Sequence, residues 1–265
     1  MTLTLAIGPV HLDTEGQDLR RRLAMRLVDA LSTPVEVVQT ETYADVAAKL
    51  QGGEADLGWL PPAQYVRAEE DGPLTLLARV ERSSGDGYRG VLFVRQDADV
   101  NTVADLSDKA VAWVDKDSCA GHLFVRLALR EGGHETQFSE ERFAGSHHAV
   151  VQAVISGEAD AGATHAQTLD DGETLLLTGW HPFVGADGMR PLLVSSPIPS
   201  DVICAAGALD AAVAHDVKAA LLALHEEDAG DLVEEFFGGA RLVGADPSDY
   251  DTVRAALDTP AQTGR

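Results

Sequence analysis

Residues 113–121 have the types and the order that suit an anion. A strand is predicted over 110–113, and small residues, Ser118 among them, lead from it into a predicted helix over 121–131. The first backbone N–H groups of a helix lack partners within it and carry the positive end of its dipole, so they can surround a tetrahedral oxyanion. Ser118 adds a hydroxyl, and Gly121 permits close approach to the backbone. A Ser118 that only caps the helix fits the pattern equally well.

A second candidate segment, 145–149, stands at the entry to a predicted helix over 149–155. His147 could donate a hydrogen bond to an anion there, and a bound dianion would favour its protonated form. The other interpretations are an N-cap by Ser146 with exposed histidines, or a metal site. No metal is expected, because the candidate ligands lack a recognised zinc spacing. These ligands are Cys119, His122, His147, His148 and His165.

Two tyrosines stand out in a chain with only 5% aromatic residues. Tyr43 and Tyr88 each open or precede a predicted element, where a phenolic hydroxyl could reach a cleft. Taken alone, each tyrosine also fits a half-buried packing role. The sequence has no nucleophile elbow, no Walker loop and no dinucleotide fingerprint. We therefore predict no catalytic residues and no cofactor.

Strands and helices alternate along the chain, which is typical of α/β proteins whose parallel sheets are covered by helices. Strands are predicted at 2–7, 35–38, 55–60, 74–80, 90–95, 110–113, 159–163, 191–195 and 203–205. Helices are predicted at 13–31, 43–50, 121–131, 149–155, 211–225, 231–237 and 250–257.

The order of these elements predicts two lobes. The chain leaves the first lobe through a turn at 83–87, forms the second, and returns after the segment 196–201. We assign 1–90 and 195–265 to lobe 1 and 91–194 to lobe 2, each with a mostly parallel sheet flanked by helices. Two such crossings form a hinge that opens and shuts a cleft, and clefts are where ligands bind.

Length and composition fit this organisation. A chain of 265 residues with 45% hydrophobic residues can build two cores. The net charge of -23 argues against a nucleic-acid or anionic-membrane surface, because phosphates would be repelled. An anion can still bind locally, since physiological salt screens charges beyond about 8 Å. Cys119 and Cys204 fall in different lobes, so we expect two free thiols.

The location of the protein stays open at this level. No stretch approaches the roughly 18 apolar residues of a membrane span, and the N-terminus lacks a basic region followed by an apolar one. The sequence fits the mature, periplasmic form of an exported protein, with its signal outside this numbering. It equally fits a cytoplasmic relative of such a protein.

Several short motifs, in this order, resemble the phosphate/phosphite/phosphonate-binding proteins of ABC importers. None of the motifs is specific by itself, but together they run over most of the chain. The matching stretches are 42–45, 55–65, 87–94, 103–106, 118–121, 145–154, 157–161 and 196–201. The resemblance implies the type II periplasmic binding protein fold. It also places the family's anion-binding tyrosines on Tyr43 and Tyr88, its serine-rich loop on 118–121 and its histidine on His147.

Two parts of the implied site depart from the family pattern. Cys119 and Ala120 stand where relatives have hydroxyl residues, so Ser118 is the only hydroxyl of the loop. Gln167 stands where aminoalkylphosphonate binders have a glutamate, whereas Asp201 matches the other acidic position. Losing a carboxylate removes a charge-assisted hydrogen bond to an amine. Phosphite, methylphosphonate or phosphate is therefore favoured over an aminoalkyl ligand.

The function predicted is that of a solute-binding protein rather than an enzyme. It captures a small phosphonate, phosphite or phosphate-like oxyanion between its lobes for an ABC permease, and it works as a monomer without nucleic acid. One alternative is a cytoplasmic enzyme of the same fold, like the chorismate-dehydrating or futalosine-processing relatives of menaquinone synthesis. His147 or Asp201 would then be the acid or base. Another alternative is a sensor whose closure is read by a partner protein.

Overall fold

The structure is a computed structural model that describes residues 2–10, 14–82, 88–134, 138–169, 174–226 and 230–259. It divides into two compact units. Unit 1 comprises Met1–Ser83 and Ser200–Tyr250, and unit 2 comprises Ser84–Pro199 and Asp251–Arg265. Each unit has its own sheet and its own hydrophobic core, so each is described separately below.

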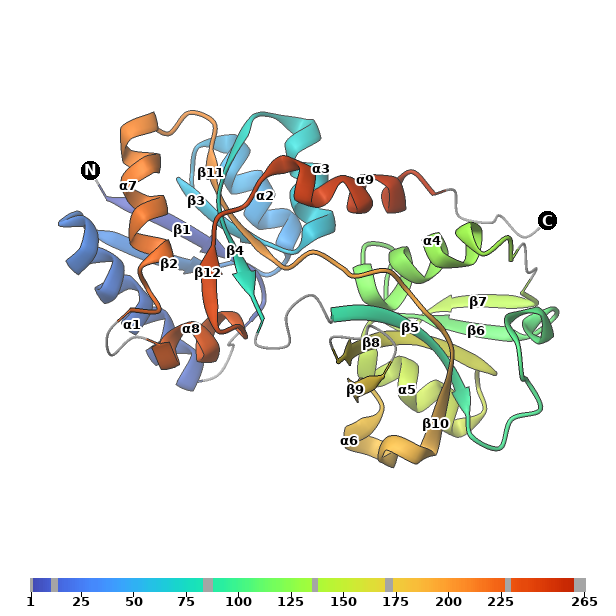
Figure 1. Cartoon of the computed structure of the whole chain (residues 1–265). Coiled ribbons are helices and arrows are strands. Elements are labelled where there is room, and N and C mark those ends of the chain that lie inside the picture. The colour runs from blue at the N-terminus through green and yellow to red at the C-terminus, as the bar shows by residue number, and fades with distance from the viewer. Residues whose placement is uncertain are drawn as a thin grey trace. The chain divides into compact units, whose positions relative to one another are not determined.

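Unit 1 is built on a sheet with the strand order β12-β4-β11-β3-β1-β2 (Figure 1). Its strands are β1 (Leu3–Ile7), β2 (Val35–Gln39), β3 (Leu57–Leu60), β4 (Leu74–Glu81), β11 (Val202–Ala206) and β12 (Arg241–Val243). β1 pairs in parallel with β2 and β3. β11 pairs antiparallel with β3 and β4, and β12 pairs antiparallel with β4. A strand from late in the chain therefore lies inside the sheet formed by the first strands.

Helices cover both faces of this sheet. They are α1 (Thr14–Leu31), α2 (Tyr43–Gly52), α3 (Pro62–Asp71), α7 (Ala211–Leu222), α8 (Gly230–Phe237) and the 3₁₀ turn η5 (Pro247–Tyr250). α1 contacts α7 and α8, α2 contacts α3, and Figure 1 shows these two groups on opposite sides of the sheet. Leu23 and Leu27, four residues apart on α1, are fully buried in the core, as the helical spacing predicts.

The start of α2 is fixed by local hydrogen bonds. Thr42 Oγ1 accepts a hydrogen bond from the Asp45 N–H at 3.1 Å, and the Asp45 carboxylate accepts one from the Thr42 N–H at 2.9 Å. This capping box places Tyr43 at the first position of the helix. The helix ends at Gly52, and Gly53 caps it with a φ of 71°, which is in the left-handed region.

Unit 2 has the strand order β10-β5-β8-β6-β7, and β9 pairs with β8 beside this path. Its strands are β5 (Tyr88–Arg95), β6 (Ala110–Trp113), β7 (Glu140–Phe143), β8 (Ala161–Thr168), β9 (Leu175–Thr178) and β10 (Met189–Val194). Its helices and turns are η1 (Val103–Leu106), η2 (Cys119–Leu123), α4 (Phe124–Glu131), α5 (His147–Ser156), α6 (His181–Val184), η3 (Ala186–Gly188) and α9 (Asp251–Leu257).

The two faces of the second sheet carry different helices. Along β8, Ala166 belongs to the core that contains Val150 and Val154 of α5. Ala163 belongs to the core on the other face, which contains Val125 of α4. Because side chains alternate along a strand, Thr164 and Ala166 point toward α5, whereas Ala161 and Ala163 point toward α4.

The structure corrects the prediction in three respects. The α/β class with helix-flanked sheets is confirmed, but both sheets are mixed rather than mostly parallel. β5 pairs antiparallel with β8 and β10, just as β11 does with its neighbours in unit 1. The predicted helix over 121–131 begins earlier, in the π turn η2. Elements α3, α6, β7, β9 and β12 were not predicted. The strands among them have only three or four residues, too few for a clear pattern. The mixed sheets were missed because strand direction depends on contacts between residues far apart in the sequence.

The compact units and the predicted lobes differ in extent. The units place the strand beginning at Tyr88 in unit 2, and they group 251–265 with unit 2, where α9 contacts α4. The turn at 83–87, predicted as the outward crossing, lies outside the described residues. The lobe division into 1–90 with 195–265 and 91–194 stays a prediction. None of the helices within the described ranges is both long and apolar enough to cross a membrane.

Candidate functional site

The 118–121 loop of unit 2 is folded by its own hydrogen bonds. Ser118 Oγ accepts a hydrogen bond from the Gly121 N–H at 3.0 Å, which confirms the predicted cap. The Leu123 N–H donates to the Ser118 carbonyl at 3.0 Å, and the Val114 N–H donates to the Gly121 carbonyl at 3.2 Å. A Cβ on Gly121 would lie 2.3 Å from Cγ2 of Val114, so only glycine fits. Capping leaves the anion-binding role of Ser118 a prediction.

The loop lies directly against β5. A Cβ on Gly90 would lie 2.6 Å from the carbonyl oxygen of Ala120, so this glycine allows the backbone of the loop to approach the strand. The Gly90 N–H donates to Ser195 Oγ at 2.9 Å, and the Ser195 N–H donates back to the Gly90 carbonyl at 2.8 Å. These contacts hold β5, the 118–121 loop and Ser195, which follows β10, in fixed positions relative to one another.

His122 packs between aromatic side chains and holds the 118–121 loop in place. Its ring lies edge-on to Trp113 at 5.4 Å and to Phe143 at 5.2 Å between centroids. Its Nδ1 is 3.1 Å from the Lys116 carbonyl, and because a carbonyl only accepts, Nδ1 carries the proton. Burial lowers the pKa of His122. This histidine therefore positions the loop and is not presented to a ligand.

His147 is the first residue of α5. Ser146 caps the helix by accepting a hydrogen bond from the Ala149 N–H at 3.1 Å. His147 Nδ1 is 3.0 Å from Oγ1 of Thr164, and its ring lies edge-on to His165 with centroids 4.8 Å apart. Burial, and in second place the nearby His165, lower the pKa of His147 to about 4. The exposed His148 instead lies against Phe183, at 4.6 Å.

Tyr88 and Gln167 lie directly opposite each other on the antiparallel pair β5 and β8. The Tyr88 ring stacks on His165 with centroids 6.4 Å apart and an interplanar angle of 23°. The Tyr88 carbonyl accepts a hydrogen bond from the Ile198 N–H at 2.9 Å. Ring contacts therefore join Tyr88, His165 and His147 in one cluster.

Two predicted site residues belong to unit 1. The ring of Tyr43 lies over Gly8, at the end of β1, where an added Cβ would be 2.2 Å from Tyr43 Cε1. The Asp201 carbonyl accepts a hydrogen bond from the Val80 N–H at 3.1 Å, which anchors the residue at the start of β11. Tyr43 and Asp201 interact electrostatically, so the fold brings them close together.

Burial shifts both groups of unit 1 toward their protonated forms. It raises the pKa of Tyr43 to about 12, and the nearby Asp201 contributes in the same direction. Burial also raises the pKa of the Asp201 carboxyl, although the positive charge of Arg82 acts against this. Tyr250 lies in the same region, where its hydroxyl donates to the Ser200 carbonyl at 3.1 Å.

The predicted site residues therefore fall into two groups. Tyr88, the 118–121 loop, His147 and Gln167 belong to unit 2, and Tyr43 and Asp201 belong to unit 1. Their joint role in one binding site stays a prediction. Sequence reasoning missed Thr164, Gly8 and Gly90. Thr164 is a lone polar residue after the apolar run 161–163, and this signal could have identified it. The roles of Gly8 and Gly90 had no such signal, because a glycine beneath a ring or a loop is recognised only from tertiary contacts.

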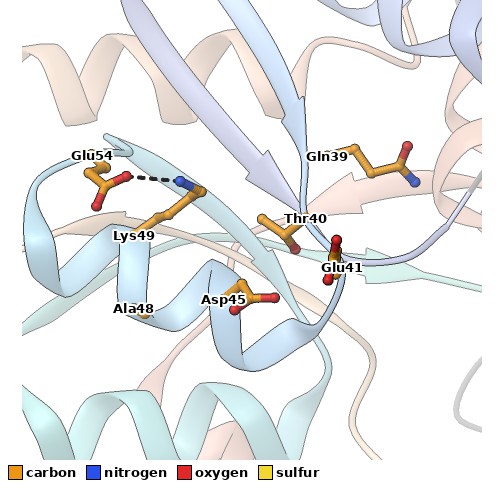
Figure 2. Close-up of a pocket in the computed structure, with 7 residues that line it drawn as sticks. All are labelled: Gln39, Thr40, Glu41, Asp45, Ala48, Lys49 and Glu54. Carbon is orange, nitrogen blue, oxygen red and sulfur yellow. Dashed lines mark hydrogen bonds and ion pairs between the residues drawn. The ribbon is translucent and has the colours of Figure 1, made fainter.

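The pocket at the start of α2 in unit 1 is a poor anion site. A pocket of about 440 Å³ in unit 1 is lined by Glu41, Asp45, Lys49 and Glu54 among others (Figure 2). Its one cationic lining residue, Lys49, pairs with Glu54 at 2.9 Å, and the remaining carboxylates would repel an anion. In the described part of the chain, no cluster of three or more His, Cys, Asp or Glu side chains could hold a metal ion.

Comparison with solved structures defines the class of protein. XAC2383 from Xanthomonas citri, solved bound to ATP, aligns with a TM-score of 0.79 and 19% identity over 97% of this chain and 96% of that one. PhnD1 from Prochlorococcus marinus, solved with methylphosphonate, aligns with a TM-score of 0.72 and 18% identity over 96% of both chains. Identities this low show the fold alone, which is that of two-lobe periplasmic binding proteins, as predicted.

The family follows from sequence. The model of the family described as "ABC transporter, phosphonate, periplasmic substrate-binding protein" matches residues 5–250, and this chain belongs to that family. The phosphate-import protein PhnD of Mycolicibacterium smegmatis is 28% identical over 280 residues, covering 97% of this chain and 85% of PhnD. The family and these relatives are solute-binding proteins rather than enzymes, which confirms that part of the prediction.

Proposed function

We propose that this protein captures a small phosphorus oxyanion and delivers it to an ABC permease. Tyr43 and Asp201 of unit 1 and Tyr88, His147 and the 118–121 loop of unit 2 bind the ligand. Membership of a phosphonate and phosphate-binding family supports this function. Within the fold, the observation that carries it is the grouping of donors in unit 2.

The donors of unit 2 suit a tetrahedral oxyanion. The loop and the start of α5 each present the beginning of a helical segment, where backbone N–H groups lack helical partners. Ser118 is half-buried, and its hydroxyl accepts from the Gly121 N–H, so its own proton can be donated to a ligand. Hydrogen bonds to a charged group contribute about 1.5–3 kcal/mol each.

The side chains next to these donors favour ligands without an amine. Gln167 carries no charge, and burial raises the pKa of Asp201, so a ligand ammonium would find weaker partners than two carboxylates. Phosphate, phosphite and methylphosphonate are therefore the ligands we propose. Import of phosphate by the related PhnD of M. smegmatis, as its name states, supports the same group of ligands.

A thermal-shift screen tests this function. Purified protein is heated with phosphate, phosphite, methylphosphonate, 2-aminoethylphosphonate or sulfate, and each hit is measured by calorimetry. A ligand at about 100 times its dissociation constant stabilises the folded protein by about 2.7 kcal/mol. We expect a shift with at least one of the first three ligands and a smaller one with 2-aminoethylphosphonate. No shift with any of the five would contradict the proposal.

The role in transport is tested separately. We expect the ligand-bound protein to be a monomer in size-exclusion chromatography with light scattering. It should also stimulate the ATPase activity of its permease in proteoliposomes. Stimulation that is equal with and without ligand would argue against coupling between binding and import.

A further inference from the structure

A buried hydroxyl meets the histidine that the proposed function assigns to the anion. Thr164 lies on β8, is fully buried and points toward α5. Its Oγ1 is 3.0 Å from Nδ1 of His147. Within the described part of the chain, this is the only hydrogen bond of the Thr164 side chain. The direction of this bond decides which ring nitrogen of His147 carries a proton.

The two directions differ in cost. If Nδ1 carried the proton, it would donate to Oγ1, and the hydroxyl proton of Thr164 would be buried without an acceptor among the described residues. Leaving a buried donor unsatisfied costs about 1–3 kcal/mol. If Nδ1 is bare, the hydroxyl donates to it and both groups are satisfied. The second arrangement places the ring proton on Nε2.

We propose that Thr164 is a positioning residue that fixes His147 as the neutral Nε2–H tautomer and thereby makes it a hydrogen-bond donor to the oxyanion. This inference rests on the proposed function, because His147 has to contact the anion for the tautomer to matter there. It adds a residue that never touches the ligand. It also specifies that His147 contributes a proton donor and no positive charge.

The surroundings of His147 agree with a neutral ring. The titratable group that faces it is His165 on β8, and burial together with His165 lowers the pKa of His147 to about 4. β6 has no titratable side chain. The remaining titratable groups on β5, α5 and α6 have other described contacts. They are Tyr88 on His165, Arg89 with Ser195, Arg95 with Asp97 and the Val154 carbonyl, His148 on Phe183, and His181 with Thr178.

Two other histidines of unit 2 provide internal references. His122 Nδ1 faces the Lys116 carbonyl and must carry a proton. His181 Nδ1 accepts a hydrogen bond from the Thr178 N–H at 2.9 Å and must be bare in the neutral ring. The Thr178 hydroxyl also lies 2.8 Å from this nitrogen, so the pair resembles His147 with Thr164 except that a backbone donor is present as well.

The experiment is a long-range ¹H–¹⁵N correlation spectrum of the ligand-free, ¹⁵N-labelled full chain at pH 8. Histidine-to-glutamine variants assign the ring signals. We expect His147 to show the pattern of His181, with a bare Nδ1 and a protonated Nε2, and His122 to show the opposite tautomer. A His147 ring protonated at Nδ1 at this pH would overturn the inference.

Substitutions test the cause. Thr164→Val should give His147 a mixture of tautomers and weaken binding of the ligand found in the screen by about 3- to 10-fold, the range of one hydrogen bond. Thr164→Ser should restore the single tautomer and the affinity. Thr178→Val should leave His181 unchanged, because its backbone donor remains. An unchanged His147 spectrum in folded Thr164→Val would also overturn the inference.

The outcomes separate this inference from the proposed function. The spectra need no ligand, so they test the tautomer even if no oxyanion binds. If an oxyanion binds and His147 has a protonated Nδ1, only the inference fails. If Thr164→Val does not fold, the wild-type and Thr164→Ser spectra still decide which nitrogen carries the proton.

Discussion

In unit 1 the candidate residues are two side chains, one at the start of α2 and one at the start of β11, whereas unit 2 offers a loop backbone, a hydroxyl and an imidazole. Burial acts on both groups. It raises the pKa of Tyr43 to about 12 and lowers that of His147 to about 4, so the acid keeps its proton and the base does not gain one. The two pKa values shift in opposite directions, but the result is the same, because Tyr43 and His147 are both neutral hydrogen-bond donors at physiological pH.

Neutral donors suit the binding of an anion by so acidic a protein, as proposed above. The net charge of -23 provides no attraction for an anion at long range, and burial favours the neutral forms of both Tyr43 and His147. Hydrogen bonds from neutral donors act only at contact distance and are little affected by screening. The difference between the units then lies in the number of donors, and unit 2 has more.

The largest expected effect comes from removing donors of unit 2. Ser118→Ala combined with His147→Ala should weaken oxyanion binding by more than about 100-fold, because each hydrogen bond to a charged group contributes about 1.5–3 kcal/mol. Tyr43→Phe, the matched change in unit 1, should cost about 10-fold. Calorimetry on the wild type, the double variant and Tyr43→Phe measures both losses of affinity. A greater loss for Tyr43→Phe than for the double variant would reverse the comparison.

The next effect concerns acid stability. The unfolded chain protonates His147 as the pH falls below about 6.5, but the folded protein resists until about 4, so stability is lost between these values. The loss is up to about 3 kcal/mol. His147→Gln should therefore flatten the decrease in urea unfolding free energy from pH 6.5 to 4. The exposed His148→Gln is the control, and an equal flattening by both would refute the assignment.

A similar or smaller effect is expected at the glycines beneath the candidate residues. Gly90→Ala, which meets the Ala120 carbonyl, and Gly8→Ala, which meets the Tyr43 ring, should each destabilise by about 1–3 kcal/mol through overpacking. Gly8→Ala should also weaken binding without touching unit 2. Gly52→Ala, whose nearest neighbour would be 3.9 Å away, should not destabilise. Equal melting temperatures for all three variants would contradict the close packing around Gly8 and Gly90.

The smallest expected effect is at Asp201. A carboxyl with a raised pKa costs free energy when it ionises in the folded state, so stability falls as the pH rises through that pKa. Asp201→Asn should stabilise the ligand-free protein at pH 7 to 8 by up to about 1 kcal/mol, and the gain should vanish at pH 3. The exposed Asp187→Asn serves as the control. Destabilisation at pH 8 would mean that the carboxylate has a favourable partner.

Local patterns predicted most helices and strands, because periodicity and caps act over a few residues. Tyr43 at the start of a helix and Ser118 at a cap follow directly from such signals. The antiparallel insertion of β11 did not, since strand direction depends on partners more than a hundred residues away. The contact between His147 and Thr164 was also out of reach, because a helix start and a buried strand meet only in the folded unit.

The difference between the two thiols has a practical consequence. Cys204 lies fully buried on β11, and burial raises the pKa of its thiol to about 12, whereas Cys119 is half-buried in the 118–121 loop. Thiol-reactive dyes attack the thiolate, so they should label Cys119 in preference. The sequence thus already contains one reactive attachment point for a fluorescent reporter within the candidate binding loop. A biosensor made from this protein would need no engineered cysteine.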